Sequence, residues 1–312
     1  MPIKIQDSLP AQKTLEGENI FVMTEYRAMH QDIRPLHVLV LNLMPAKIET
    51  ETQLLRKLSN TPLQVEVEFM QTASYQPRHV EASHLDTFYT VFDEVKNRNF
   101  DGMIITGAPL DHKKFEDVSY WPELCQIMEW SRTHVHCTLH MCWGTYAALY
   151  YHYGIDKVNL EKKLSGVYEH HVMKKNSPLF RGFDDVFYAP QSRAMTVPRE
   201  EIEKVPELEL LACSDEAGVT IVKTRDSRQF FITCHPEYDS DTLAREYFRD
   251  KKKGMNPDLP VNYFPGNDPE RPPVVRWRSA GQLLYSNWLN YYVYQSTPYD
   301  VKQIAGENNE DK

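Results

Sequence analysis

The sequence lacks the features that carry a chain into or across a membrane. None of its apolar runs is long enough to span a bilayer. Its first 20 residues lack the apolar core of a signal peptide. We therefore expect a cytoplasmic protein with no membrane partner.

Cysteine and basic residues are scarce. The five cysteines are odd in number and form no C-x-x-C pair, which predicts reduced thiols and neither a disulfide framework nor a metal site. Asp and Glu (44) outnumber Lys and Arg (35), and the net charge is -9. Because a general nucleic-acid binder needs a basic face, we expect no nucleic-acid partner.

The composition, with 41% hydrophobic and 25% charged residues in 312, is that of a soluble globular protein. Apolar or alternating runs predict strands at 36–44, 63–69, 100–109, 135–139, 207–212, 219–224 and 229–234. Helical patterns occur at 49–58, 87–95, 121–131, 146–151, 241–253 and 288–294. Residues 157–185 show a looser pattern, typical of loops and short elements.

The alternation of strands and helices predicts an α/β fold, with a mostly parallel sheet and helices on both faces. The sequence contains no internal repeat and no low-complexity linker. We therefore expect a single domain over residues 1–312, with an N-terminal arm at 1–34 and a disordered tail at 305–312.

Cys142 lies where one predicted strand gives way to a helix. Such a turn lifts a side chain above a parallel sheet, and the unpaired N–H groups at the start of the helix favour a thiolate. Gly144 allows a close approach of the backbone. The alternative is an ordinary buried cysteine, so the partners of Cys142 must decide between the two.

His235 and Glu237 directly follow the apolar strand 229–234. In an open α/β sheet, functional groups gather at the carboxyl ends of strands, which is where Cys142 also falls. A thiol needs a base, and an imidazole needs a carboxylate that sets its orientation. The three residues predict a nucleophile, a base and an orienting acid, although the tripeptide alone would be interpreted as a solvated strand end.

The turn Thr106-Gly107-Ala108-Pro109-Leu110 follows a third strand. Backbone N–H groups of this turn, at Leu110, together with that of Trp143, could hold an oxyanion. The alternative is an ordinary Gly-Pro turn, which is the commoner case.

Six motifs together resemble one known family. They are Asn42-Leu43-Met44-Pro45, 58–64 (LSNTPLQ), Thr106-Gly107-Ala108-Pro109, Cys142-Trp143-Gly144, 235–239 (HPEYD) and 287–294 (NWLNYYVY). They resemble the homoserine O-acyltransferases of the type related to class I glutamine amidotransferases, along almost the whole chain. The resemblance implies a flavodoxin-like, class I glutamine amidotransferase-like sheet with added N- and C-terminal segments. It also implies that there is no metal or redox cofactor.

The resemblance further implies acyl transfer from an acyl-CoA co-substrate to the hydroxyl of L-homoserine, the first committed step of methionine biosynthesis from homoserine. Cys142 would take the acyl group as a thioester. His235 would act as general base, first for the thiol and then for the hydroxyl, and Glu237 would orient it. Water must be excluded from the second step, which makes an oxygen ester.

The same resemblance points to three substrate-binding residues. Arg249 and Lys163 would supply cations for the homoserine carboxylate, Arg249 as a bidentate clamp. Ser192 corresponds to the family's substrate-contacting serine. From the residue types alone, Lys163 and Arg249 would be interpreted as solvated surface charges.

The chain departs from the family's commonest pattern in three places. Thr145-Tyr146 stands where Ala-Gln is expected, Cys234 where Gly is expected, and Gln191 where His is common. None of these changes removes a member of the triad. Cys234 is expected to be a buried small residue rather than a second catalytic thiol.

Asp111 occupies the position at which the family discriminates between acyl groups, where succinyl users usually have Gly and acetyl users usually have Glu. A fixed carboxylate would repel the carboxylate at the end of a succinyl chain in a partly desolvated pocket. Acetyl-CoA is therefore the expected donor and succinyl-CoA the alternative. A further possibility is that Asp111 only caps a turn.

Two other functions compete with acyl transfer. Cys-His-x-Glu on this fold also serves amide hydrolysis by glutaminases, and a binding module could retain the fold without activity. The presence of all three triad residues argues against the binding module. A homodimer is possible, but the aromatic residues of the C-terminal segment are expected in the core rather than at an interface: Tyr285, Trp288, Tyr291, Tyr292 and Tyr294.

Overall fold

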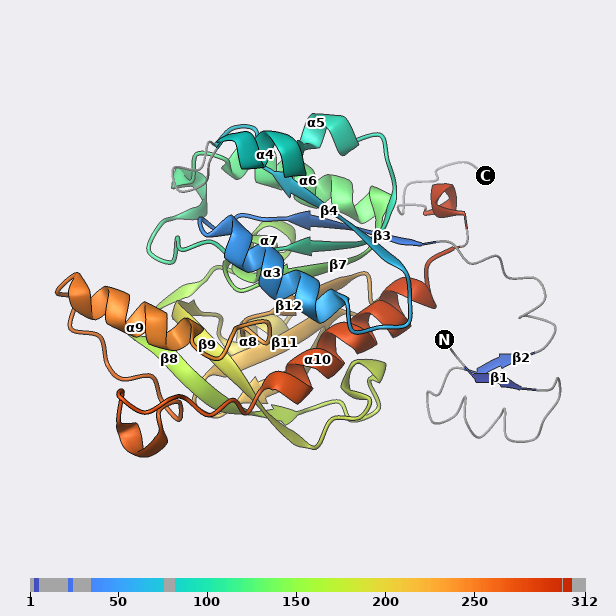
Figure 1. Ribbon diagram of the computed structural model, residues 1–312. Coiled ribbons are helices and arrows are strands. Elements are labelled where there is room, and N and C mark those ends of the chain that lie inside the picture. Colours follow the sequence, from blue (N-terminus) through green and yellow to red (C-terminus); the bar gives the residue numbers. More distant parts are fainter. Residues whose placement is uncertain (1–2, 6–21, 25–34, 76–81, 299, 305–312) are drawn as a thin grey trace.

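The computed structural model describes residues 3–5, 22–24, 35–75, 82–298 and 300–304, and its largest element is a ten-stranded sheet (Figure 1). The strand order is β5-β4-β3-β6-β7-β12-β11-β10-β8-β9. A separate parallel pair joins β1 (Ile3–Ile5) to β2 (Val22–Thr24). The rest of the predicted N-terminal arm and the predicted tail 305–312 lie outside the described residues.

One half of the large sheet is parallel, as predicted. It contains β3 (Leu36–Leu41), β4 (Val65–Gln71), β5 (Tyr89–Val91), β6 (Phe100–Ile105), β7 (Val135–Met141) and β12 (Gln229–Ile232). Strands β3 and β6 are buried on both faces, which explains their continuous apolar sequences. Because these strands run in one direction, their carboxyl ends meet at one edge.

The other half is antiparallel. It contains β8 (Val158–Val172), β9 (Val186–Thr196), β10 (Leu208–Ser214) and β11 (Gly218–Thr224), and β12 joins the two halves by pairing with β7 on one side and β11 on the other. The sheet is therefore mixed, with its parallel part forming the α/β core.

Helices cover both faces of the sheet. Apolar side chains of α3 (Lys47–Leu58), α10 (Arg278–Asn287) and the π-helix Trp288–Tyr294 join one core cluster. Those of α5 (Phe92–Val95), α6 (Trp121–His134), α7 (Trp143–Tyr153) and α8 (Arg199–Glu203) join a second cluster. The remaining helices are α4 (Ala82–Phe88), α9 (Thr242–Lys252) and 3₁₀ turns at Phe115–Asp117, Pro178–Phe180, Pro265–Asn267 and Val301–Gln303.

Two predicted elements differ in the structure. The predicted helix 87–95 is interrupted by β5, because Tyr89-Thr90-Val91 pairs with residues 69–71 at the edge of the sheet. The segment 157–185, predicted to hold loops and short elements, contains the 15-residue strand β8. Its polar residues 159–163 are largely exposed and break the alternation that identifies a half-buried strand.

The aromatic C-terminal segment packs in the core, as expected. Tyr285 and Trp288 are fully buried, and the indole of Trp288 lies against the sheet at Gly102, where an added Cβ would come within 3.0 Å of the ring. Tyr291 and Tyr294 pack partly buried against the same cluster. Within the described ranges, every helix is too short or too polar to cross a membrane.

Candidate active site

Cys142 occupies a strained turn between β7 and α7. Its φ of 47° and ψ of -116° lie in a region that residues other than glycine rarely adopt. The backbone holds it there, because the Cys142 N–H donates to the carbonyl of Ile232 on β12 over 2.7 Å. The hydroxyl of Thr145 lies 2.8 Å from the carbonyl oxygens of both His140 and Ile232, so this departure from the family pattern ties the turn to two strands.

Two glycines allow this turn to approach the end of β6 closely. A Cβ on Gly144 would lie 2.7 Å from the carbonyl oxygen of Thr106, a distance that real Cβ atoms do not show. A Cβ on Gly107 would lie 3.1 Å from the Cβ of Cys142 and 3.4 Å from the backbone nitrogen of Trp143. The predicted close approach at Gly144 is confirmed, and the turn after β6 lies beside the nucleophile.

His235 and Glu237 form a buried pair just beyond the end of β12. The Nδ1 atom of His235 lies 2.7 Å from Oε1 of Glu237, and both residues are 5% exposed. The His235 N–H donates to the carbonyl of Pro190 on β9, and the ring of Tyr238 stacks on the imidazole with centroids 4.2 Å apart. The ring is thus held by Glu237 and Tyr238 and the backbone by Pro190, and Nε2 is left to serve the sulfur.

The electrostatics of the pair favour an imidazolium. Burial by itself would lower the pKa of His235, but the negative charges of Cys142 and Glu237 outweigh it and raise that pKa well above its ordinary value. An imidazolium beside a cysteine is the kind of partner that can activate a thiol as a nucleophile. Cys234, in contrast, is fully buried, and burial raises the pKa of its thiol, in agreement with the prediction of a buried small residue.

A buried cation lies behind this pair, and the sequence reasoning missed it. Burial lowers the pKa of Lys57, while the charge of Glu237 acts in the opposite direction. Helix α10 packs on the same turn, since a Cβ on Gly281 would lie 2.4 Å from the carbonyl oxygen of Pro236 and 3.3 Å from Nζ of Lys57. Nothing in the local sequence of α3 distinguishes Lys57 from its exposed neighbours.

The two predicted oxyanion donors, the backbone N–H groups of Trp143 and Leu110, differ in their surroundings. The backbone nitrogen of Trp143 lies at the start of α7 beside Gly107, next to the nucleophile. The N–H of Leu110 donates to the carbonyl of Ala108 over 2.8 Å, so in this conformation it is engaged within its own turn. A role for Leu110 stays a prediction that requires this turn to open.

Two of the three predicted substrate-binding residues, Ser192 and Lys163, meet at one carboxylate that the sequence reasoning also missed. Glu246 on α9 accepts hydrogen bonds from Ser192 (2.5 Å), Lys163 (3.2 Å) and the hydroxyl of Tyr238 (3.2 Å). Arg249, one helical turn further on, donates to Asp250 over 2.8 Å. The spacing Glu246-x-x-Arg249 on one helix face is a signal that could have revealed the carboxylate.

Asp111 is not an isolated charge in an open pocket. Its carboxylate accepts the N–H of Ala194 on β9 over 2.6 Å, and its carbonyl accepts a hydrogen bond from Lys157. Burial raises the pKa of Tyr146, and the charges of Cys142 and Asp111 act on it in the same direction.

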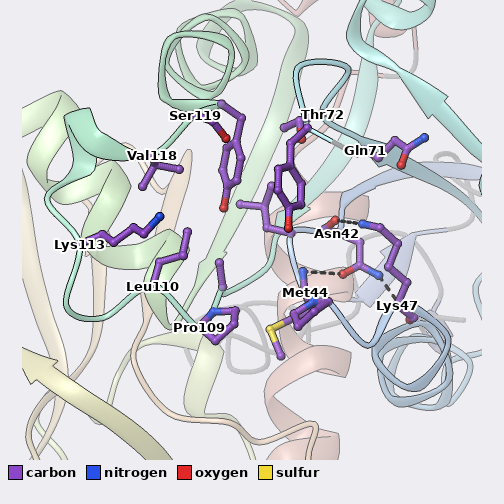
Figure 2. A pocket seen from close by; sticks show the side chains of 15 residues that line it. Asn42, Met44, Lys47, Gln71, Thr72, Pro109, Leu110, Lys113, Val118 and Ser119 are labelled. Atoms are coloured by element: carbon purple, nitrogen blue, oxygen red, sulfur yellow. Dashed lines mark hydrogen bonds between the residues drawn. The ribbon is translucent and has the colours of Figure 1, made fainter. Parts of the chain in front are cut away.

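A cavity of about 160 Å³ borders the turn after β6 (Figure 2). Its walls come from the segments that follow β3, β4 and β6 and include Leu110, Lys113 and Tyr120. The buried ammonium of Lys47 also borders it and donates to the carbonyl of Asn42 over 2.6 Å. Burial lowers the pKa of Lys47 to about 8. Among the described residues, no group of three or more His, Cys, Asp or Glu side chains is arranged to hold a metal ion.

Comparisons with known proteins find similar sequences along almost the whole chain. The family model described as homoserine O-succinyltransferase matches residues 2–299. A homoserine O-acetyltransferase of Petrotoga mobilis is 57% identical over 97% of this chain and 98% of its own length. One from Lachnospira eligens is 58% identical over the same shares of the two chains.

Solved structures support the fold alone. A glutamine amidotransferase from Thermotoga maritima superposes with a TM-score of 0.53 at 12% identity, over 82% of this chain and 98% of that one. A glutamine amidotransferase from Methylobacillus flagellatus gives a TM-score of 0.51 at 12% identity, over 83% and 95%. The predicted class I glutamine amidotransferase-like fold is confirmed.

Proposed function

Because the chain belongs to the homoserine O-succinyltransferase family, we propose that it transfers an acetyl group from acetyl-CoA to the hydroxyl of L-homoserine through a thioester on Cys142. The product is O-acetyl-L-homoserine, an intermediate of methionine biosynthesis. The names of the full-length relatives support this activity. The observation that carries the chemistry is the buried set of Cys142, His235 and Glu237 at the carboxyl ends of β7 and β12.

The first half-reaction begins from the thiolate–imidazolium pair. The sulfur of Cys142 attacks the thioester carbon of acetyl-CoA, and the backbone N–H of Trp143 supports the oxyanion. The bond from that carbon to the CoA sulfur breaks, and the CoA thiolate takes the proton from His235. One thioester replaces another, so the step depends on positioning rather than on a large driving force.

The second half-reaction returns the proton. Neutral His235 takes the proton of the homoserine hydroxyl at Nε2 while the oxygen attacks the acetyl carbon. The bond to sulfur breaks, which leaves the thiolate of Cys142 and the imidazolium of His235 as at the start. Glu237 holds Nδ1–H and stabilises the imidazolium each time it forms.

Homoserine binds between β8, β9 and α9 in this proposal. Arg249 clamps its carboxylate with help from Lys163, and Ser192 contacts the substrate. The carboxylate of Glu246, which three donors already surround, accepts the substrate's ammonium group. The substrate thereby replaces hydrogen bonds that the free protein makes within itself.

The acyl donor approaches from the opposite side of the turn after β6. Its pantetheine arm occupies the cavity beside Leu110 and Lys113. Gly107, which lies against Cys142, directly precedes Ala108 in the wall of that cavity. The fixed negative charge of Asp111 disfavours a succinyl chain relative to an acetyl group. We further propose that the enzyme works in the cytosol and needs neither a metal ion nor a redox cofactor.

The test is a purified-protein assay that follows free CoA with L-homoserine and either acetyl-CoA or succinyl-CoA. We expect CoA release that depends on acetyl-CoA. The C142A variant should lose this release, and the C234A variant should keep it. Faster turnover of succinyl-CoA would contradict the role given to the charge of Asp111. Ammonia release from glutamine, with no release from either thioester, would replace the proposal with a glutaminase.

A further inference from the structure

The antiparallel pair β8–β9 contains an irregularity at the candidate substrate site. Asn159 pairs with Met195, and the next pair along the strands is Leu164 with Arg193. Residues 160–163 of β8 therefore lie opposite the single residue Ala194 of β9. This bulge ends at Lys163, and Ser192 lies two positions from Ala194 on the other strand. The two predicted homoserine ligands of the hairpin, Lys163 and Ser192, thus lie at the end of the bulge and close to it.

The bulge leaves Ala194 without a partner residue in the β8–β9 register. Ala194 is 8% exposed, and an unpaired backbone N–H at a buried position is costly. The carboxylate of Asp111 accepts this N–H over 2.6 Å, across 83 positions of sequence. A hydrogen bond with an ionised acceptor is roughly twice as strong as one between neutral groups.

A second contact ties the same turn to the other strand. The carbonyl of Asp111 accepts a hydrogen bond from Lys157, which directly precedes β8. The turn after β6 therefore holds both strands of the hairpin on the side of the bulge. The neighbouring Leu110 lines the cavity proposed for the acyl donor, so in the proposed function the turn lies between the two substrates.

We propose that Asp111 is a positioning residue for the homoserine site: by accepting the Ala194 N–H it holds the β8–β9 bulge, and hence Lys163 and Ser192, in the geometry that binds the acceptor substrate. This role rests on the proposed function and is separate from the effect of the Asp111 charge on the acyl donor. The first role needs only an acceptor oxygen, whereas the second needs a negative charge.

Two substitutions separate the roles. D111N keeps an acceptor oxygen for Ala194 and removes the charge, whereas D111A removes both. H112A, at the exposed next position of the same turn, is the matched control. For each protein, KM for homoserine is measured at saturating acetyl-CoA. The rate of acetyl-enzyme formation is measured without homoserine, from the burst of free CoA and the intact mass.

We expect D111A to raise KM for homoserine about tenfold, which corresponds to about 1.4 kcal/mol. Its rate of acetyl-enzyme formation should stay within about threefold of wild type, since the first half-reaction does not use the hairpin ligands. D111N should restore KM for homoserine to within about threefold of wild type, even if its preference between donors changes. H112A should behave as wild type.

Several results would overturn the proposal. An unchanged KM for homoserine in D111A would show that the Ala194 bond does not position the site, and a D111N value as high as that of D111A would assign the effect to charge. If D111A does not fold, A194P takes its place, because proline removes the N–H that Asp111 accepts, and an unchanged KM for homoserine in A194P would overturn the proposal. If the wild-type protein releases no CoA in response to homoserine, the proposed function itself fails, a result distinct from an active wild type with an unaffected D111A.

Discussion

The parallel and antiparallel halves of the large sheet contribute different kinds of residue to the candidate active site. Cys142 and His235 follow parallel strands, are nearly fully buried, and are held by backbone hydrogen bonds within and beside their own turns. Lys163 and Ser192 belong to an antiparallel hairpin, are partly exposed, and meet a carboxylate from a distant helix. The candidate reacting groups thus lie in the buried core, and the candidate substrate ligands lie in a more solvated region.

This difference predicts separate kinetic signatures. Changes on the parallel half should lower kcat, because they affect groups that act on the reacting atoms. Changes on the antiparallel half should raise KM for homoserine and leave acetyl-enzyme formation unaltered.

The largest effect is expected for Cys142→Ala. Without the sulfur no thioester can form, so kcat should fall by at least about 10³-fold. The assay is CoA release with homoserine and acetyl-CoA, combined with intact-mass detection of the acetyl-enzyme. Cys234→Ala is the matched control, since its thiol is buried and has no role in the proposed reaction. Residual acetylation of Cys142→Ala at wild-type rates would place the nucleophile elsewhere.

A smaller loss is expected for Glu237→Gln. The amide oxygen can still accept Nδ1–H but lacks the charge that stabilises the imidazolium, so kcat should fall on the order of 10²-fold. KM for homoserine should change little, and both parameters come from the same steady-state assay. A raised KM for homoserine with an unchanged kcat in Glu237→Gln would contradict the distinction between the parallel and antiparallel halves of the sheet.

Lys163→Met tests the antiparallel half. Loss of the ammonium should raise KM for homoserine about tenfold, while the rate of acetyl-enzyme formation stays near that of wild type. Lys162→Met is the matched control, because Lys162 is the neighbouring residue and pairs 3.5 Å away with Asp258 at the exposed surface. Equal effects of the two substitutions would point to general electrostatic attraction rather than a binding site.

The smallest effect concerns the protonation of His235. Its pKa is raised in the folded protein, so the protonated ring stabilises the fold below its unfolded pKa of about 6.5, and this contribution is lost as the pH rises through the folded value. Cys142→Ala removes one of the two negative charges that hold the proton, so the pKa of His235 should fall. The loss of stability that follows deprotonation of His235 should then occur at lower pH. NMR titration of His235 in the wild type and in Cys142→Ala measures the pKa. An unchanged value in the variant would show that Cys142 and His235 do not interact electrostatically.

Most of the candidate catalytic centre could be predicted because its placement depends on short stretches of sequence. An apolar strand, a cysteine and a helix-compatible segment place Cys142 at a strand end, and the His-x-Glu spacing places a base and its partner after the next parallel strand. The helix 87–95 was predicted wrongly because pairing with β4 overrides the local helical pattern at Tyr89–Val91.

The strand β8 escaped prediction for a related reason. Its polar segment forms a bulge whose pairing is completed by a residue from another part of the chain, and Asp111 lies 83 positions from Ala194. Glu246 was overlooked although its spacing to Arg249 on one helix face was a usable signal. Lys57 was overlooked because its importance comes from what packs around it, which no local pattern records.

The amino-acid sequence by itself determined the α/β architecture and the placement of Cys142 and His235 at strand ends, since strand periodicity and strand-end placement are properties of short segments. Only the tertiary structure decided which charges surround the substrate site, which backbone N–H Asp111 accepts, and how far burial and neighbouring charges shift His235. Those depend on distances between segments far apart in the chain, and electrostatic and hydrogen-bond energies are set by such distances.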